Sequence, residues 1–259
     1  MKKISLFAAL LAATLVSFSA CQSKDDPKPK PDPKPDPAPD DVFVSPITID
    51  GNFADWDALD ASKVVVATTQ EGAKFDALKT VKVYADKLYI NVYFEFDGDQ
   101  IVDRSWVPFH IYLDVDNKTT TGGYGDEFTD ASVDFMLETA IFSEGAFNNY
   151  NPSLWKWWGG VNESGWLWSD PSSDHDESDF WGALIGEGQA AIGNGNGSGN
   201  KYEIQILREM MTGAVFADTF GIGFDIQQDW SSCGILPNAP MTDENPNGLA
   251  ALLKVTIDK

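Results

Sequence analysis

The sequence predicts an all-β fold, a single large antiparallel β-sandwich over residues 42–259. Three observations support this prediction. Apolar and polar residues alternate with a period of two in several short stretches, which is the pattern of strands with two different faces. Clusters of Gly, Asn, Asp or Pro bound these stretches and favour turns. No long stretch keeps the 3.6-residue apolar spacing of a helix, and the spacing of the strands favours a sandwich.

The predicted strands follow one another along this domain. Their alternating positions fall at 81–83 and 88–96 around a turn at 85–87, then at 109–113, 133–137, 202–206, 222–226 and 253–257. Tryptophans at 155, 157, 166 and 168 predict a hairpin whose turn is the stretch 159–165. We expect one or two helical turns near 207–213 and a flexible glycine loop at 193–199.

The first 41 residues predict export, lipidation and a tether. Lys2 and Lys3 precede an apolar run and then small residues, which is the pattern of a secretory signal over residues 1–20. The segment that ends at Cys21 resembles a bacterial lipobox, which implies that Cys21 carries the lipid; the alternative is an ordinary secreted protein in which this cysteine is incidental. Residues 21–41 continue as a linker rich in Pro, Lys and Asp, a composition that favours extended polyproline II.

Two further observations concern location and partners. Residues 22–26 resemble the short acidic export signal of surface lipoproteins of Bacteroidetes, which implies an outer-membrane lipoprotein that faces the cell exterior. The formal net charge of −22 excludes nucleic acid as a partner, because nucleic-acid binding needs Lys and Arg to displace counterions. The same charge opposes anionic lipid, so we expect the membrane contact to be the lipid anchor alone.

The scarcity of cysteine and histidine argues against disulfides, a zinc site and a Ser–His catalytic relay. Cys21 and Cys233 are the two cysteines, so lipidation of the first leaves the second without a disulfide partner. His110 and His175 leave little material for a zinc site or a Ser–His relay. The acidic stretch at 170–179 is interpreted as a solvated loop.

Short motifs in the domain resemble family 9 carbohydrate-binding modules and their DOMON-like relatives. They are ITIDGNFADW at 47–56, LYINV at 88–92, LDVDN at 113–117 and TGGY at 121–124, with the strands at 202–208 and 222–226 fitting the same pattern. The resemblance implies a DOMON-like or jelly-roll-like antiparallel sandwich, and some members of that group bind sugars between aromatic rings and carry structural calcium. From the residues themselves, Asp50-Gly51 predicts a turn and Trp56 a plug of the core.

An aromatic cluster between 148 and 168 is the candidate ligand site. Indole rings that face solvent can stack on the apolar faces of sugar rings, while nearby amides bind hydroxyl groups. The alternative is that the rings fill the sandwich core. The candidate ligand-binding residues are Tyr150, Trp155, Trp157, Trp158, Asn162, Trp166 and Trp168.

Oxygen-bearing side chains between 114 and 130 form a candidate calcium site. Calcium takes about six to eight oxygen ligands, and a calcium ion here is expected to rigidify the loop. The alternative is a hairpin end whose Asp and Asn side chains cap their own backbone. The candidate ligands are Asp114, Asp116, Asn117, Asp126 and Asp130.

The leading functional hypothesis is a non-catalytic surface lipoprotein that binds a glycan, beside neighbouring surface proteins of glycan uptake. A glycoside hydrolase is the first alternative, and it requires paired carboxylates ~5–9 Å apart. Glu95, Asp134 and Glu138 are available for that role but stand in no recognisable catalytic motif. The second alternative is a structural surface protein whose tryptophans dock onto a partner protein.

Overall fold

A computed structural model describes residues 43–123, 126–130, 132–150, 152–169, 189–190, 193–211 and 214–259. The chain divides into two units, Met1–Val42 and Phe43–Lys259, and the described residues all belong to the second unit. The predicted signal segment, Cys21, the linker and the acidic stretch at 170–179 lie outside the described residues. Within the described ranges, no helix has the length and apolar character that crossing a bilayer requires.

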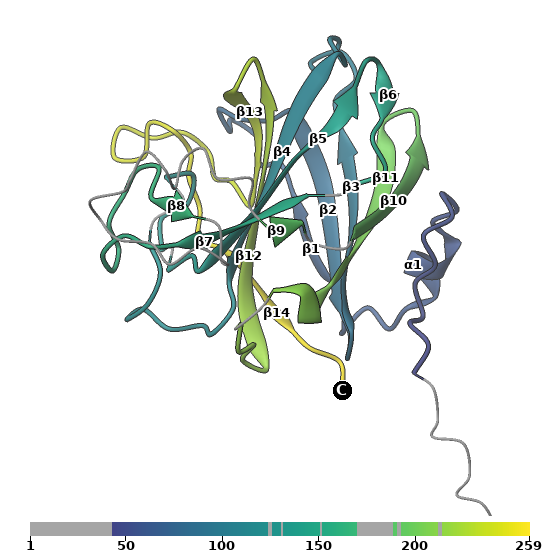
Figure 1. Cartoon of the computed structure of the whole chain (residues 1–259). Coiled ribbons are helices and arrows are strands. Elements are labelled where there is room, and N and C mark those ends of the chain that lie inside the picture. The colour runs from purple at the N-terminus through teal and green to yellow at the C-terminus, as the bar shows by residue number, and fades with distance from the viewer. Residues whose placement is uncertain are drawn as a thin grey trace, which may run out of the picture. The chain divides into compact units, whose positions relative to one another are not determined.

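The described strands form two antiparallel sheets that pack face to face (Figure 1), so the predicted all-β sandwich is confirmed. The smaller sheet has the order β1 (Val65–Thr68), β2 (Leu78–Ala85), β3 (Tyr89–Phe96), β11 (Lys201–Leu207) and β10 (Gly193–Ser198). The larger sheet has the order β13 (Ser231–Leu236), β12 (Thr219–Gln228), β4 (Trp106–Asp114), β5 (Phe135–Ser143), β7 (Ser153–Trp157) and β8 (Trp168–Ser169). In addition, β14 (Leu253–Thr256) pairs with β12, β6 (Ala146–Phe147) with β5, and β9 (Gln189–Ala190) with β7. The helices are α1 (Ala54–Ala58) and the 3₁₀ turn η2 (Arg208–Met210).

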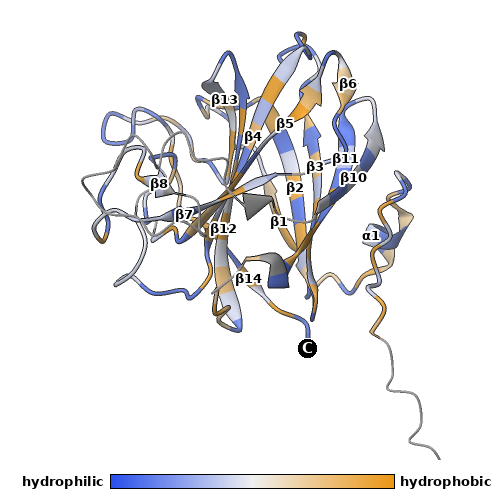
Figure 2. Ribbon diagram, viewed as in Figure 1, coloured by the Kyte–Doolittle hydropathy of each residue, from blue (hydrophilic) through white to orange (hydrophobic). Residues whose placement is uncertain are grey.

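The core lies between the two sheets because alternate strand residues point into it. Figure 2 shows hydrophobic and hydrophilic bands alternating along the strands. Phe109, Ile111 and Leu113 of β4 are fully buried in this core, and each buried side chain of this kind contributes about 1.5–3 kcal/mol. His110 and Tyr112 of the same strand therefore point to the outer face of the larger sheet.

The segment before β1 covers the outer face of the smaller sheet, and the predicted burial of Trp56 is confirmed there. Trp56 of α1 is buried beside Tyr93, and its Nε1 donates a hydrogen bond of 3.0 Å to Oε2 of Glu203. The backbone N–H groups of Asp50 and Gly51 donate to Oε1 of the same carboxylate at 2.9 and 2.8 Å. Gly51 lies at φ +79°, a conformation that glycine adopts without strain in this turn.

The predicted glycine loop at 193–199 is wrong, because Gly193–Ser198 forms strand β10. A Cβ atom on Gly193 would lie 2.6 Å from the carbonyl oxygen of Tyr150, and one on Gly195 would lie 2.7 Å from the ring of Phe147. The alternate glycines therefore leave room for two aromatic residues against the strand. The predicted helical turns near 207–213 are realised in part, as the three residues of η2.

Candidate functional site

Three neighbouring strands place a row of polar side chains on the outer face of the larger sheet. His110 of β4 pairs in register with Asp225 of β12 on one side and with Glu138 of β5 on the other. Residues two apart share a face, so Tyr112 and Gln227 extend the row. His110 is 2% exposed and Asp225 is 0% exposed, so these polar groups depend on one another for hydrogen bonds.

Hydrogen bonds fix the floor of this row. Nε2 of Gln227 donates to Oδ2 of Asp225 at 2.6 Å and lies 3.3 Å from Nδ1 of His110. The hydroxyl of Ser232 also donates to Oδ2 of Asp225, at 2.9 Å. Nε2 of His110 faces Oε2 of Glu138 at 3.6 Å, too far for a good hydrogen bond. Three buried atoms of the row consequently lack a hydrogen-bond partner within the described ranges: His110 Nε2, Glu138 Oε2 and Asp225 Oδ1.

Burial sets the charge of these groups. It lowers the pKa of His110 to about 4, so the ring is neutral near pH 7. It raises the pKa of Asp225 to about 7, although the hydrogen bonds from Gln227 and Ser232 act to lower it. Burial raises the pKa of Glu138 as well. Burial and then the nearby Asp225 charge raise the pKa of Glu127 to about 9. These carboxyl groups are held where ionisation is unfavourable.

A pocket of about 300 Å³ lies over the row and has aromatic walls. Its aromatic walls are Tyr112, Trp166, Trp168 and Trp230. Its polar lining residues are His110 and Gln227 from the row, with Ser232, Asp126 and Glu127. Trp166 and Trp230 are 41% and 60% exposed, so two indole rings are accessible to a ligand. We call this the Trp166–Trp230 pocket, and its volume lies at the lower end of the ~300–1,000 Å³ range of ligand sites.

Trp230 is held at the rim by an unusual turn. Strands β12 and β13 are joined by the two residues Asp229 and Trp230, which lie at φ +49° and +60°. Two-residue hairpin turns of this kind strongly prefer Gly or Asn, and a bulky residue there is strained. The ring of Trp230 lies 6.5 Å from that of Trp106, which is also exposed. Strain of this kind is often found where a side chain must be presented for a function.

The prediction that the rings of the candidate cluster face solvent is wrong for most of them, and the alternative of burial holds instead. Tyr150, Trp155, Trp157 and Trp168 are only 0%, 7%, 7% and 2% exposed, and Trp158 is half-buried. The predicted hairpin itself is confirmed, since Trp157 pairs with Trp168 across β7 and β8. Of the candidate ligand residues, Trp166 and Asn162 are exposed, and of these two Trp166 lines the pocket.

The buried rings form a second core on the outer face of the larger sheet, which explains the correction. Trp155, Trp157 and Trp168 pack there with Tyr112 and Phe128. The remaining members of this second core are Val133, Met136, Ile235 and Leu252. Tyr150 belongs instead to the core between the sheets.

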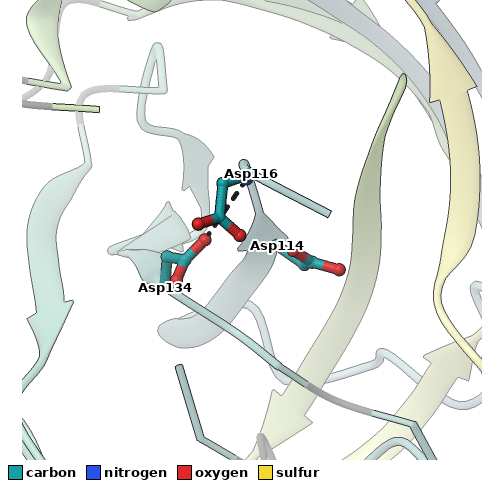
Figure 3. Close-up of side chains that lie close together, drawn as sticks. All are labelled: Asp114, Asp116 and Asp134. Atoms are coloured by element: carbon teal, nitrogen blue, oxygen red, sulfur yellow. Dashed lines mark hydrogen bonds between the residues drawn. The ribbon is translucent and has the colours of Figure 1, made fainter. Parts of the chain in front are cut away.

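The predicted calcium ligands are brought together in part. Asp114 and Asp116 lie with Asp134, each offering an oxygen within 4.8 Å of the others. Figure 3 shows the carboxylates of Asp116 and Asp134 pointing toward one another. The other three candidates turn elsewhere: Asp126 accepts from the N–H of Gly165, Asp130 from that of Leu252, and Asn117 from Nζ of Lys254.

The chemistry of this aspartate cluster fits a hard cation. Burial, followed by the neighbouring charge of Asp116, raises the pKa of Asp134 to about 6, and burial raises the pKa of Asp114. Oδ1 of Asp114 is buried without a hydrogen-bond partner in the described part of the chain. Nζ of Lys254 and Nζ of Lys118 lie 3.2 and 3.0 Å from Asp114 and Asp116 and supply part of the missing positive charge. A calcium ion bound by these three carboxylates would compete with the two lysines.

The polar floor and Trp230 were not among the predicted site residues, although the sequence holds two signals for them. Asp225 and Gln227 stand on one face of a strand whose other face is apolar from Phe220 to Ile226. A tryptophan follows Asp229 in a two-residue turn where glycine is expected. The alternation of His110 and Tyr112 was visible, but the pairing that places them beside Asp225 and Glu138 depends on strands distant in sequence.

Comparison of the sequence with known protein families and with curated proteins finds no match. Among solved structures, the chain is similar to a family 9 carbohydrate-binding module from Caldicellulosiruptor kristjanssonii in complex with cellotriose. The identity is 12%, the match covers 83% of this chain and 91% of that chain, and the TM-score is 0.35. Such a distant similarity carries no argument about the ligand of this chain, and membership of that family stays a prediction.

Proposed function

We propose that this protein binds carbohydrate in the Trp166–Trp230 pocket, as a non-catalytic lipoprotein of the cell surface. The observation that carries the proposal is the combination of two accessible indole rings with buried polar atoms that lack partners among the described residues. Indole faces can stack on the apolar face of a sugar ring, and hydroxyl groups can both donate to and accept from a polar floor. A purely apolar ligand would leave those polar atoms unsatisfied.

The positions of Asp225, Glu95 and Glu138 support binding rather than hydrolysis. Asp225 is 0% exposed beneath Gln227 and Ser232, so it cannot reach a glycosidic bond in the way that a catalytic carboxylate must. Glu95 and Glu138 lie on different sheets, on β3 and β5. Burial also raises the pKa of Cys233 to about 12, which disfavours a thiolate nucleophile.

The remaining parts of the proposal rest on the sequence. The lipobox-like segment and Cys21 support a lipid anchor, and residues 22–26 support export to the outer face of the outer membrane. A glycan held at that surface would be available to neighbouring uptake proteins. A structural calcium at Asp114, Asp116 and Asp134 completes the proposal, in place of the set expected from sequence.

The test is a panel of soluble glycans in affinity gels, followed by calorimetry on any ligand found. Trp166→Ala should weaken binding at least tenfold, because the ring is a wall of the pocket. Trp106→Ala is the matched control, since this tryptophan is 50% exposed but does not line the pocket, and its affinity should stay near that of the unchanged protein. Equal losses in the two variants, or no binding to any glycan, would contradict the proposal.

A further inference from the structure

The titratable groups that line the Trp166–Trp230 pocket point to a particular class of sugar. Two carboxyl groups line it, those of Asp126 and Glu127 from the loop after β4. The carboxyl groups of Asp225 on β12 and Glu138 on β5 do not line it and lie on either side of His110, which does. Tyr112 and His110 are the other titratable groups that line it. Within the described ranges no Lys or Arg lines the pocket, so no fixed cation offsets the acids.

We propose that the pocket prefers saccharides that carry a protonated amine over neutral saccharides, and rejects those that carry a carboxylate or sulfate. This inference rests on the proposed function and narrows its ligand class. An ammonium group supplies up to three hydrogen-bond donors and one positive charge. The lining offers the carboxyl groups of Asp126 and Glu127 as acceptors, and Nε2 of the neutral His110 ring has no hydrogen-bond partner within the described part of the chain.

The aromatic walls favour the same ligand. A cation within about 6 Å of an indole or phenol ring is attracted by the face of that ring, and the attraction grows when water is excluded. Tyr112 and Trp168 are buried at the wall, while Trp166 lies with its ring centroid 6.2 Å from that of His110. Because the His110 ring is neutral, it does not repel a cation at this place.

The same features disfavour an anionic sugar. Carboxylate and sulfate groups are usually bound by Arg or Lys, which donate charge-assisted hydrogen bonds. Here an anion would meet Asp126 and Glu127 instead. Burial without a counter-charge raises the pKa of Glu127 to about 9, and a bound ammonium would supply that counter-charge. A neutral hydroxyl group would not.

The test measures affinities of the full chain for configuration-matched sugars at pH 6.5 by calorimetry. The pairs are glucosamine with glucose, galactosamine with galactose, and mannosamine with mannose, with N-acetylglucosamine, glucuronate and ethanolamine as controls. At least one amine should bind tenfold or more tightly than its neutral partner. N-acetylation, which removes the charge and keeps the ring, should abolish the preference, and glucuronate should not bind.

A variant that cannot ionise tests the role of Glu127, whose pKa of about 9 keeps it protonated at pH 6.5 until a bound ammonium favours the carboxylate. Glu127→Gln should reduce the preference for the amine over its neutral partner to less than threefold. Glu71→Gln is the matched control, because Glu71 is exposed and does not line the pocket, and it should leave the preference unchanged.

The outcomes separate the two proposals. Equal affinity for the amine and its neutral partner, or binding of glucuronate, overturns the amine preference and leaves carbohydrate binding in place. Failure of every sugar to bind overturns both. Ethanolamine binding as tightly as glucosamine overturns saccharide recognition, because the sugar ring would then contribute nothing.

Discussion

Replacing Trp230 by glycine and by alanine separates the strain of its turn from the contribution of its ring. Trp230 lies at φ +60°, in the left-handed region. That region costs an L-residue with a Cβ atom roughly 1–2 kcal/mol, whereas glycine adopts it freely. The greater freedom of glycine in the unfolded chain reduces this stability advantage by about 0.4–1 kcal/mol. Trp230→Gly should therefore be more stable than Trp230→Ala by about 1 kcal/mol, or about 2–4 °C in Tm.

Both variants should lose ligand affinity to the same extent. An aromatic side chain of this size covers about 150–250 Å², and Trp230 is 60% exposed. A ligand that covers half of the exposed area gains about 1–2 kcal/mol at ~25 cal/mol per Å². Binding should weaken by about 5–30-fold, measured by calorimetry with the ligand that the glycan panel identifies.

The stability order of the two variants tests the left-handed turn. Thermal melts and urea unfolding measure it, with Ser231 as control. Ser231 begins the neighbouring strand β13, so Ser231→Gly should be less stable than Ser231→Ala by about 0.5–1 kcal/mol. If Trp230→Ala proved as stable as Trp230→Gly, the left-handed conformation of the turn would be refuted. Unchanged affinity in both would remove Trp230 from the site.

Three further predictions concern the second core, the aspartate cluster and the pocket. In urea unfolding, Trp157→Phe should lower the free energy of unfolding by about 0.5–1.5 kcal/mol more than Trp155→Phe does. The reason is that Nε1 of Trp157 donates a 3.0 Å hydrogen bond to the carbonyl of Gly160, whereas Nε1 of Trp155 has no partner in the described structure. Calcium at about 100 times its Kd should raise the free energy of unfolding by about 2.7 kcal/mol, or the Tm by about 5–11 °C. The Asp134→Asn variant should show no such gain. If neither calcium nor a chelator changes the thermal melt, no calcium ion is bound. Folding raises the pKa of Glu127 to about 9. The contribution of this carboxyl group to the free energy of unfolding is therefore fully present below its ordinary pKa of 4.5, and it is lost as pH rises toward 9. Glu127→Gln should therefore be more stable than the unchanged protein at pH 8, by about 1–3 kcal/mol, and nearly equal to it at pH 4; the opposite order in melts at the two pH values would contradict the buried, uncompensated carboxyl.

The fold was predictable because alternation is a local signal. Phe109, Ile111 and Leu113 stand two apart and are all buried, so their strand and its inward face follow from a few neighbouring letters. The glycines of β10 misled the prediction for the same reason. Their loop-like composition is local, but the aromatic rings of Phe147 and Tyr150 that require them come from another part of the chain.

The site was less predictable because it depends on which strands become neighbours. Local spacing placed Trp155 and Trp157 on one face of a strand correctly. It could not show that this outer face is itself covered, since the cover includes Phe128 from a loop distant in sequence. The aspartate cluster shows the same limit. Asp114 and Asp116 are close in sequence, but the third member is Asp134 because β5 returns beside β4.

The close fit of the second core gives a reason to regard the polar row as functional. A Cβ atom on Gly223 would lie 2.2 Å from the ring of Phe128, and one on Gly123 would lie 2.0 Å from that of Trp157, so the aromatic layer rests directly on glycine. A sheet face that accepts such a layer could be apolar throughout, and well-packed apolar residues are often at least as stable as buried charged ones. Beside this layer, His110 and Asp225 instead remain buried with unfavourable ionisation and with atoms that no described residue satisfies. Packing alone does not account for that arrangement, whereas a ligand that supplies the missing hydrogen bonds does.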